Sequence, residues 1–172
     1  ELHQFVVGTS FGSPLMQFSP IKCAAMHIYS KDSGLGKTTA MEAGVSVWGK
    51  PEDLLTYEQD TVNTRMNRGE IYHSLPLYMD ELTNTHGRKL SDLVYQLTGG
   101  KQRGRMASGS NPERYRGEAW SLLAVTTGNT SVVEQVSVTK AMPKAEAQRI
   151  MECRVKRMHF ETKEETDTFS TA

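Results

Sequence analysis

The sequence predicts an α/β fold with three layers, in which helices cover both faces of a mostly parallel sheet. Short apolar runs, typical of buried strands, alternate along the chain with segments of helical composition, as in sheets built from parallel strands. The 172 residues, of which 37% are hydrophobic and 23% charged, suit a single globular domain. We expect this domain to span residues 1–172, with its core at about residues 24–160.

The N-terminal part of the chain is predicted to contain a helix, a strand and a second helix. Residues 4–18 mix apolar residues with glycines and Pro14, which favours a short helix that ends near the proline. Residues 24–29 form an apolar run that is too short for a helix, so a buried strand is expected. After a polar turn, residues 38–48 have helical composition, and a Gly-Lys-Pro sequence closes the segment.

The rest of the chain continues the alternation. The predicted elements are a short strand at 54–57, a polar helix at 59–72, a strand at 75–79, a helix at 88–97, a strand at 120–125 and a helical segment at 145–153. Residues 99–116 are rich in glycine and basic residues and poor in hydrophobic ones, so an exposed loop or hairpin is expected. Residues 161–172 form a polar tail, and together with the initial Glu1 they suggest a domain excised from a longer polypeptide.

Charge, cysteine spacing and the length of apolar runs limit the classes of protein that fit this sequence. The 20 Lys and Arg residues balance 20 Asp and Glu residues, so any nucleic-acid binding must be local. Cys23 and Cys153 lack metal-ligand spacing, which favours two buried reduced thiols over a disulfide. No apolar run approaches the roughly 20 residues that cross a bilayer. The sequence therefore predicts a cytoplasmic protein without a membrane partner.

A glycine-containing turn follows the first strand and leads into a helix, which is the context of a phosphate-binding loop. Lys31 stands where the pattern has its first glycine, and the rest of the pattern is present. Inward-turned N–H groups and the helix N-terminus favour an anion there, so we expect Lys37 to bind the β and γ phosphates of ATP and Thr38 to bind Mg²⁺. The alternative is an ordinary turn with a helix cap. The candidate nucleotide-binding residues are Ser33, Gly34, Leu35, Gly36, Lys37, Thr38 and Thr39.

Polar side chains end two further predicted strands. Asp80 and Glu81 close one apolar run, and Asn129 closes another. Ligands of parallel sheets bind at the carboxyl ends of strands, so Asp80 is expected to hold the Mg²⁺ shell and Glu81 to activate the attacking water. Asn129 is expected to contact the γ-phosphate or that water. The alternatives are a solvated acidic pair that opens a helix and a simple turn asparagine.

The basic residues fall into three groups. Lys101, Arg103 and Arg105 lie in the glycine-rich segment, where a mobile basic loop can follow a single-stranded nucleic-acid backbone or contact another subunit. A second pair, Arg114 and Arg116, flanks Tyr115, and a third pair, Arg149 and Arg154, lies near the predicted last helix.

The segments Ser-Gly-Leu-Gly-Lys-Thr-Thr, Leu-Pro-Leu-Tyr-Met-Asp-Glu-Leu and Thr-Thr-Gly-Asn resemble an AAA+ or RecA-like P-loop ATPase core over residues 26–160. The resemblance is closest to the phage- and prophage-encoded family of helicase-like P-loop ATPases. It implies that Gly36, Lys37 and Thr38 match the Walker A motif, that Asp80 and Glu81 match the Walker B pair, and that Asn129 is a sensor. It also implies that Arg149 is a finger inserted into the site of a neighbour in a hexamer-like homo-oligomeric ring.

The predicted function is that of a Mg²⁺-dependent, ATP-hydrolysing motor domain. The leading hypothesis is a ring-forming DNA helicase or primase-helicase fragment of a phage or mobile element, acting on single-stranded DNA in the bacterial host cytoplasm. Two alternatives remain open at this point. One is a nucleotide-gated assembly module with little turnover, and the other is a DNA-packaging or protein-remodelling ATPase.

Overall fold

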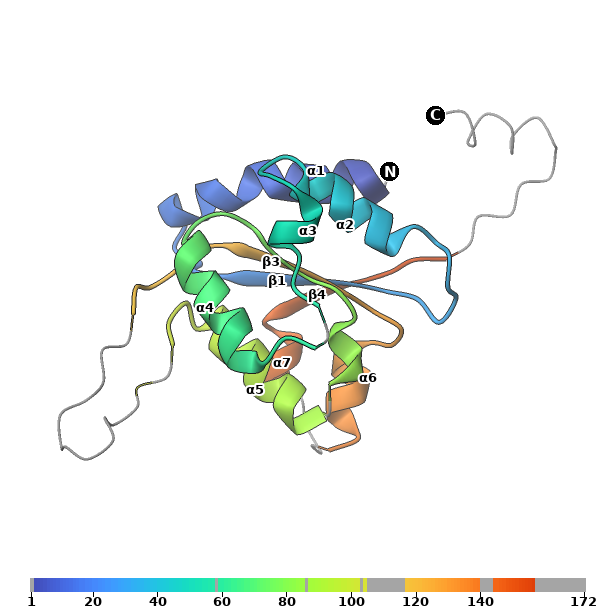
Figure 1. The fold of residues 1–172 in the computed structure, drawn as a ribbon. Helices are drawn as coiled ribbons and strands as arrows, with labels where there is room; N and C mark the ends of the chain where they lie inside the picture. The colour runs from blue at the N-terminus through green and yellow to red at the C-terminus, as the bar shows by residue number, and fades with distance from the viewer. Residues whose placement is uncertain are drawn as a thin grey trace.

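Four parallel strands form the central sheet (Figure 1). The computed structural model describes residues 2–57, 59–85, 87–102, 104, 117–139 and 144–156. The strands are β1 (Ala24–Tyr29), β2 (Leu77–Met79), β3 (Leu123–Gly128) and β4 (Ile150–Arg154), in the spatial order β2-β3-β1-β4. The α/β prediction with a parallel sheet is confirmed. Because all four strands run in one direction, the loops that follow β1, β2 and β3 meet at one edge of the sheet.

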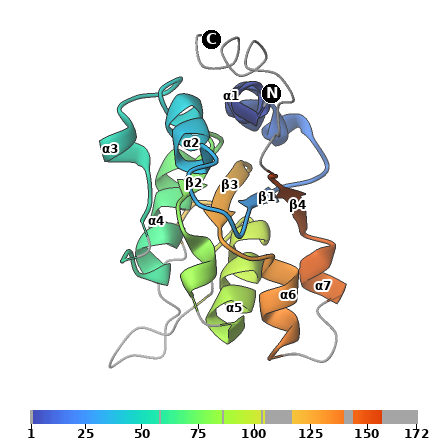
Figure 2. The same ribbon diagram turned by 90° about the vertical axis from the view of Figure 1, so that its right-hand side faces the viewer.

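One face of the sheet is covered by the N-terminal helices (Figures 1 and 2). These are α1 (Leu2–Gly12), the 3-10 helix η1 (Ser13–Phe18), α2 (Lys37–Val45) and α3 (Pro51–Leu54). Val6 of α1 and Met41 of α2 are fully buried against Ile28 of β1 and Tyr78 of β2. This burial holds α2, and with it the loop that precedes α2, in a fixed position relative to the strand ends.

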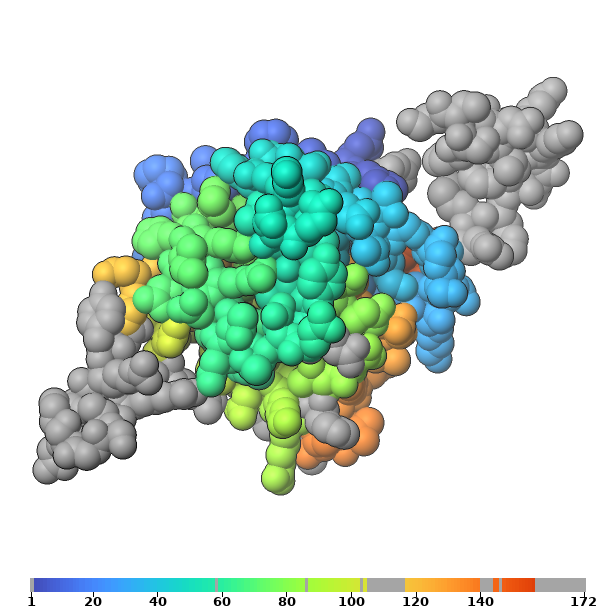
Figure 3. Space-filling model, viewed as in Figure 1, coloured from blue at the N-terminus to red at the C-terminus, as the bar shows by residue number. Residues whose placement is uncertain are grey.

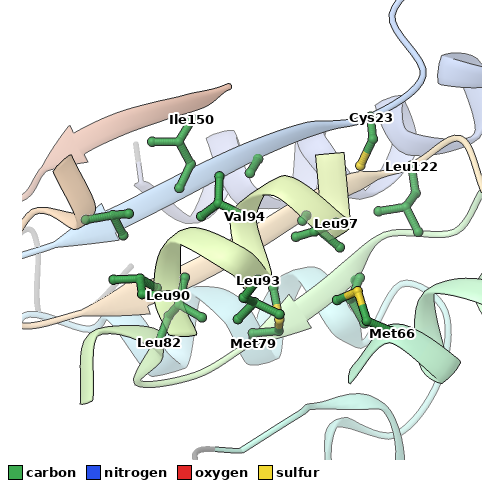
Figure 4. Close-up of a cluster of buried hydrophobic side chains, with 14 of the residues drawn as sticks. Cys23, Met66, Met79, Leu82, Leu90, Leu93, Val94, Leu97, Leu122 and Ile150 are labelled. Atoms are coloured by element: carbon green, nitrogen blue, oxygen red, sulfur yellow. The ribbon is translucent and has the colours of Figure 1, made fainter. Parts of the chain in front are cut away.

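The opposite face is covered by the later helices. These are α4 (Val62–Tyr72), α5 (Gly87–Thr98), α6 (Val132–Ser137) and α7 (Lys144–Ala147). Leu90, Leu93, Val94 and Leu97 recur at helical spacing on α5 and bury one side of that helix against the sheet (Figure 4). A short 3-10 helix, η2 (Leu82–Asn84), lies in the connection between β2 and α5.

Trp120 is buried in this second layer, immediately before β3. Its indole is 1% exposed, and its Nε1 donates a hydrogen bond of 2.8 Å to the carbonyl oxygen of Leu97 at the end of α5. The ring also lies against Gly69 of α4, where an added Cβ would be 3.5 Å from the indole. Trp120 therefore joins α4, α5 and the sheet.

Two sequence predictions were wrong about the type of element. The predicted helix at 145–153 ends at Ala147, and Ile150 begins strand β4, because this segment pairs with β1 from Ala25 onward. The predicted strand at 54–57 is reduced to a single parallel bridge between Thr56 and Met79, because α3, which Pro51 begins, extends to Leu54. Helix α6 was not predicted at all.

The cysteines are both free. Cys23 is buried beside Trp120, and burial raises the pKa of its thiol to about 12, so the thiol stays protonated. Cys153 lies half-buried on β4. Within the described ranges, we find no helix with the length and apolar character required to cross a membrane.

Candidate active site at the carboxyl edge of the sheet

The loop after β1, residues 30–36, lies beyond the carboxyl end of β1 (Figure 1) and is exposed at its tip, on the surface of the molecule (Figure 3). Gly34 and Gly36 have φ angles of 71° and 73°, in the left-handed region that favours glycine, and Gly36 directly precedes α2. Among the described residues only His73 and Glu81 combine a side chain with a positive φ. The backbone at Lys31, where the phosphate-loop pattern has its first glycine, thus accommodates a side chain.

Lys37 begins α2 and bends back over this loop. Its side chain is 8% exposed, and its Nζ donates to the carbonyl oxygens of Ser30 at 3.4 Å and Asp32 at 3.3 Å. These are long bonds for an ammonium group, which forms stronger and shorter bonds to anionic oxygens. The ammonium is therefore held at the N-terminus of α2, where an anion would also be attracted by the helix dipole.

Thr38 and Asp80 are brought together although they lie on different elements. The Oγ1 of Thr38 donates to Oδ2 of Asp80 at 3.4 Å, while Oδ1 of Asp80 accepts hydrogen bonds from the Thr127 hydroxyl and, at 3.1 Å, from the backbone N–H of Glu81. Adjacent ligands of an octahedral Mg²⁺ at about 2.1 Å are about 3 Å apart. The hydroxyl and carboxylate oxygens therefore fit a shared Mg²⁺ shell that substrate phosphate and water would complete.

Glu81 and Asn129 meet across the ends of β2 and β3. Asn129 Nδ2 donates to Oε2 of Glu81 at 3.1 Å, and the Glu81 N–H donates to the Thr127 hydroxyl at 3.2 Å. Glu81 has a φ of 51°, which is uncommon for a residue with a side chain and marks a locally strained backbone. In this conformation the Glu81 side chain meets the loop that carries Asn129.

Arg149 lies at the opposite edge of the sheet. Its carbonyl accepts a 3.4 Å hydrogen bond from the N–H of Ala25, at the start of β1. Its exposed guanidinium stacks over the Tyr95 ring of α5, 4.4 Å from the ring centroid. Five residues of strand span roughly 15 Å, so Arg149 does not belong to the group formed by Lys37 and Asp80 of its own chain.

The basic segment also begins at that opposite edge. Lys101 is exposed and follows Gly100, whose carbonyl accepts a 2.9 Å hydrogen bond from the N–H of Trp120 just before β3. Arg103 and Arg105, the other residues predicted to bind nucleic acid, lie outside the described residues.

Sequence reasoning missed three polar residues near the site: His27, Thr127 and Glu152. His27 is fully buried inside β1, with Nδ1 2.8 Å from Thr126 Oγ1 and Nε2 2.9 Å from the carbonyl oxygen of Thr130. Glu152 of β4 accepts hydrogen bonds of 2.6 Å from the Ser131 hydroxyl and from the Val132 N–H at the start of α6. The sequence did carry a signal for His27, because it is a polar residue inside the otherwise apolar run of β1.

Burial of His27 predicts a loss of stability in acid. Burial lowers the pKa of the imidazole from its usual 6.5, so the unfolded chain takes up this proton more readily than the folded protein does. The contribution is fully present above the unfolded pKa and is lost as the pH falls toward the folded pKa. We expect the free energy of unfolding, measured by urea denaturation, to fall below pH 6.5 with a slope of at most about 1.4 kcal/mol per pH unit from this site. An equally steep decline in His27→Gln would contradict this assignment.

The fold and site together define a class of protein: an α/β domain with a parallel sheet and a polar, strand-end site beside a glycine loop. The chain belongs to the family of the domain of unknown function DUF927, whose model matches residues 2–115. No curated protein sequence gives a significant match. Among solved structures, the chain is similar to one described as "SCCmec type IV Cch - active helicase", with a TM-score of 0.67 and 17% sequence identity. The similarity covers 99% of this chain but only 31% of that one, and at this identity it supports the fold alone.

Proposed function

We propose that this domain binds ATP with Mg²⁺ and hydrolyses it, as the motor of a ring-forming DNA helicase of a mobile element. The observation that carries the proposal is the convergence of Lys37, Thr38, Asp80, Glu81 and Asn129 at one edge of the sheet. These residues come from α2 and from the ends of β2 and β3. They provide a cation, two oxygen ligands for Mg²⁺, a carboxylate base and an amide donor.

Each side chain has a role in the proposed reaction. Lys37 would exchange its two long bonds to loop carbonyls for bonds to the β and γ phosphate oxygens of ATP. Mg²⁺, held by Thr38 and Asp80, would supply positive charge against the phosphate oxygens. Water would attack the γ-phosphorus, the bond from the γ-phosphorus to the bridging oxygen would break, and ADP would leave. The Glu81 carboxylate would orient the water and accept its proton.

Asn129 would stabilise this arrangement by holding Glu81. Its amide donates one hydrogen bond to the Glu81 carboxylate, which would keep that group at the strand end beside the attacking water. On release from Glu81 the same amide could donate to a phosphate oxygen. The first role requires the loop that carries Asn129 to stay fixed relative to β2.

The helicase part of the proposal rests on two supports. The solved structure with the same fold over nearly the whole chain is a helicase whose printed name includes a mobile element. The chain also carries the basic group Lys101, Arg103 and Arg105, which would contact single-stranded DNA. In a ring, Arg149 of one copy would act on the site of its neighbour, because Arg149 lies at the edge opposite to its own site.

The proposal is tested by steady-state ATPase assays of wild type and Lys37→Ala, with and without single-stranded DNA, over a series of protein concentrations. We expect Mg²⁺-dependent turnover that rises with DNA, climbs steeply with concentration and falls at least 100-fold in Lys37→Ala. Lys50→Ala, at an exposed lysine before α3, is the matched control and should retain wild-type turnover. Equal turnover in wild type and Lys37→Ala would refute the assignment.

A nucleotide-gated assembly module is the second candidate. It is favoured by the position of Arg149 at the edge of the sheet opposite to its own site, since this cation can then meet bound ATP only in a neighbouring copy. This candidate predicts ATP-dependent oligomers with little turnover, and a Glu81→Gln variant that behaves like the wild type.

A further inference from the structure

The loop that carries Asn129 is held by hydrogen bonds from three other elements. On the N-terminal side, the Asn129 N–H donates to Thr83 Oγ1 of η2 at 3.0 Å. On the C-terminal side, the Thr130 carbonyl bonds to His27 of β1, and the Ser131 hydroxyl bonds to Glu152 of β4. The backbone on both sides of Asn129 is therefore fixed, which limits the directions in which its side chain can point.

His27 is an unusual choice for the interior of a central strand. It is 0% exposed, between Met26 and Ile28, which pack in the core. A buried polar group without partners is destabilising, so both ring nitrogens need hydrogen bonds at this position. The Thr130 carbonyl can only accept, so Nε2 of His27 carries the hydrogen, and Nδ1 faces the Thr126 hydroxyl.

The strand end is shaped around this imidazole. At Gly128, an added Cβ would lie 2.9 Å from Cε1 of His27 and would collide with the Thr83 hydroxyl. Because Gly128 has no side chain, His27 and Thr83 can pack against β3 from two sides, directly before Asn129. The result is a short path of contacts from the His27 ring through the Thr130 backbone to Asn129, whose amide holds Glu81.

We propose that His27 is a positioning residue for hydrolysis: its Nε2 bond to the Thr130 carbonyl fixes the loop so that Asn129 aims the Glu81 carboxylate. This inference rests on the proposed ATPase function, and it adds a residue from the interior of β1 to the site. His27 acts on the reaction only through this loop. Its loss should lower kcat, because Glu81 is misdirected, and leave KM for ATP unchanged, because Lys37 and Thr38 are held by α2.

Two substitutions separate the two ring nitrogens. The amide nitrogen of glutamine reaches about as far as Nε2, so His27→Gln keeps a donor to the Thr130 carbonyl. The amide of asparagine is level with Nδ1, so His27→Asn keeps a partner for the Thr126 hydroxyl and loses the bond to Thr130. Both variants keep a polar side chain of smaller volume in the same cavity.

The test measures kcat and KM of wild type and both variants, together with hydrogen exchange of the Asn129 backbone amide. We expect kcat to fall on the order of tenfold in His27→Asn with KM within twofold, and to recover in His27→Gln. Exchange at Asn129 should be faster in His27→Asn only. Equal loss of kcat in both variants, or wild-type kcat in His27→Asn, would overturn the proposal.

Hydrogen exchange keeps this test distinct from that of the proposed function. If the wild type shows no turnover, the ATPase proposal fails while the exchange pattern still reports on the loop. Exchange at Asn129 that is the same in all three proteins would show that His27 does not fix the loop, whatever the fate of the ATPase proposal.

Discussion

Glu81→Gln is expected to lower ATP turnover by about 10²–10³-fold while leaving the affinity for Mg·ATP within about threefold of wild type. The glutamine amide cannot accept the proton of the attacking water, but its oxygen can still accept the hydrogen bond from Asn129. The local structure is therefore retained and only the chemical step is impaired. Turnover is measured by phosphate release and affinity by calorimetry.

Glu52→Gln is the matched control for this prediction. Glu52 is exposed in the first turn of α3, and the same change of charge there should leave turnover unaffected. If Glu81→Gln retains wild-type turnover, Glu81 is not the base, and the assembly-module candidate becomes the better account.

Trp120→Ala is expected to lower the free energy of unfolding by about 3–5 kcal/mol. The substitution removes the side chain that joins α4, α5 and the sheet, and it leaves the Leu97 carbonyl without its 2.8 Å hydrogen bond from the indole. A loss of this size is a large fraction of the free energy of unfolding of an ordinary domain. Urea denaturation measures it, and Trp120→Phe should lie between wild type and Trp120→Ala.

Trp48→Ala provides the comparison for Trp120→Ala. Trp48 is 41% exposed and donates a 3.2 Å hydrogen bond to the Ser10 carbonyl, so its removal should cost less than half as much. Equal destabilisation by the two substitutions would contradict the role assigned to Trp120 in joining α4, α5 and the sheet.

The parallel sheet could be predicted because its signals are local. The apolar run of β1 and the helical composition after Lys37 lie within a few residues of each other, and the rule for parallel strand ends then places Asp80 and Asn129 beside Lys37. The structure has these residues at one edge, as the rule requires. Their chemical roles stay predictions.

The errors arose where pairing with distant residues decides the local structure. Residues 150–154 are compatible with a helix, but β1 offers an unpaired edge and Ile150 fits the core beside it, so a strand forms. The six residues of α6 carry too little periodicity to be recognised, and the Glu152 carboxylate that caps α6 comes from β4.

The roles of the supporting residues could not be predicted for the same reason, although His27 was visible as a polar residue in an apolar run. His27 and Thr83 gain their roles only because β3 and its loop lie between β1 and η2, an arrangement that appears in no local pattern. At Lys31, where the phosphate-loop pattern has its first glycine, the backbone has no positive φ and accommodates a side chain.

The central claim is that Lys37 and its neighbours bind Mg·ATP, and isothermal titration of ATP into wild type and Lys37→Ala, with and without Mg²⁺, tests it most directly. The account predicts saturable one-site binding by wild type that is tightened by Mg²⁺ and weakened at least tenfold in Lys37→Ala. Equal affinity in the two proteins, or no binding by wild type at millimolar ATP, would contradict it.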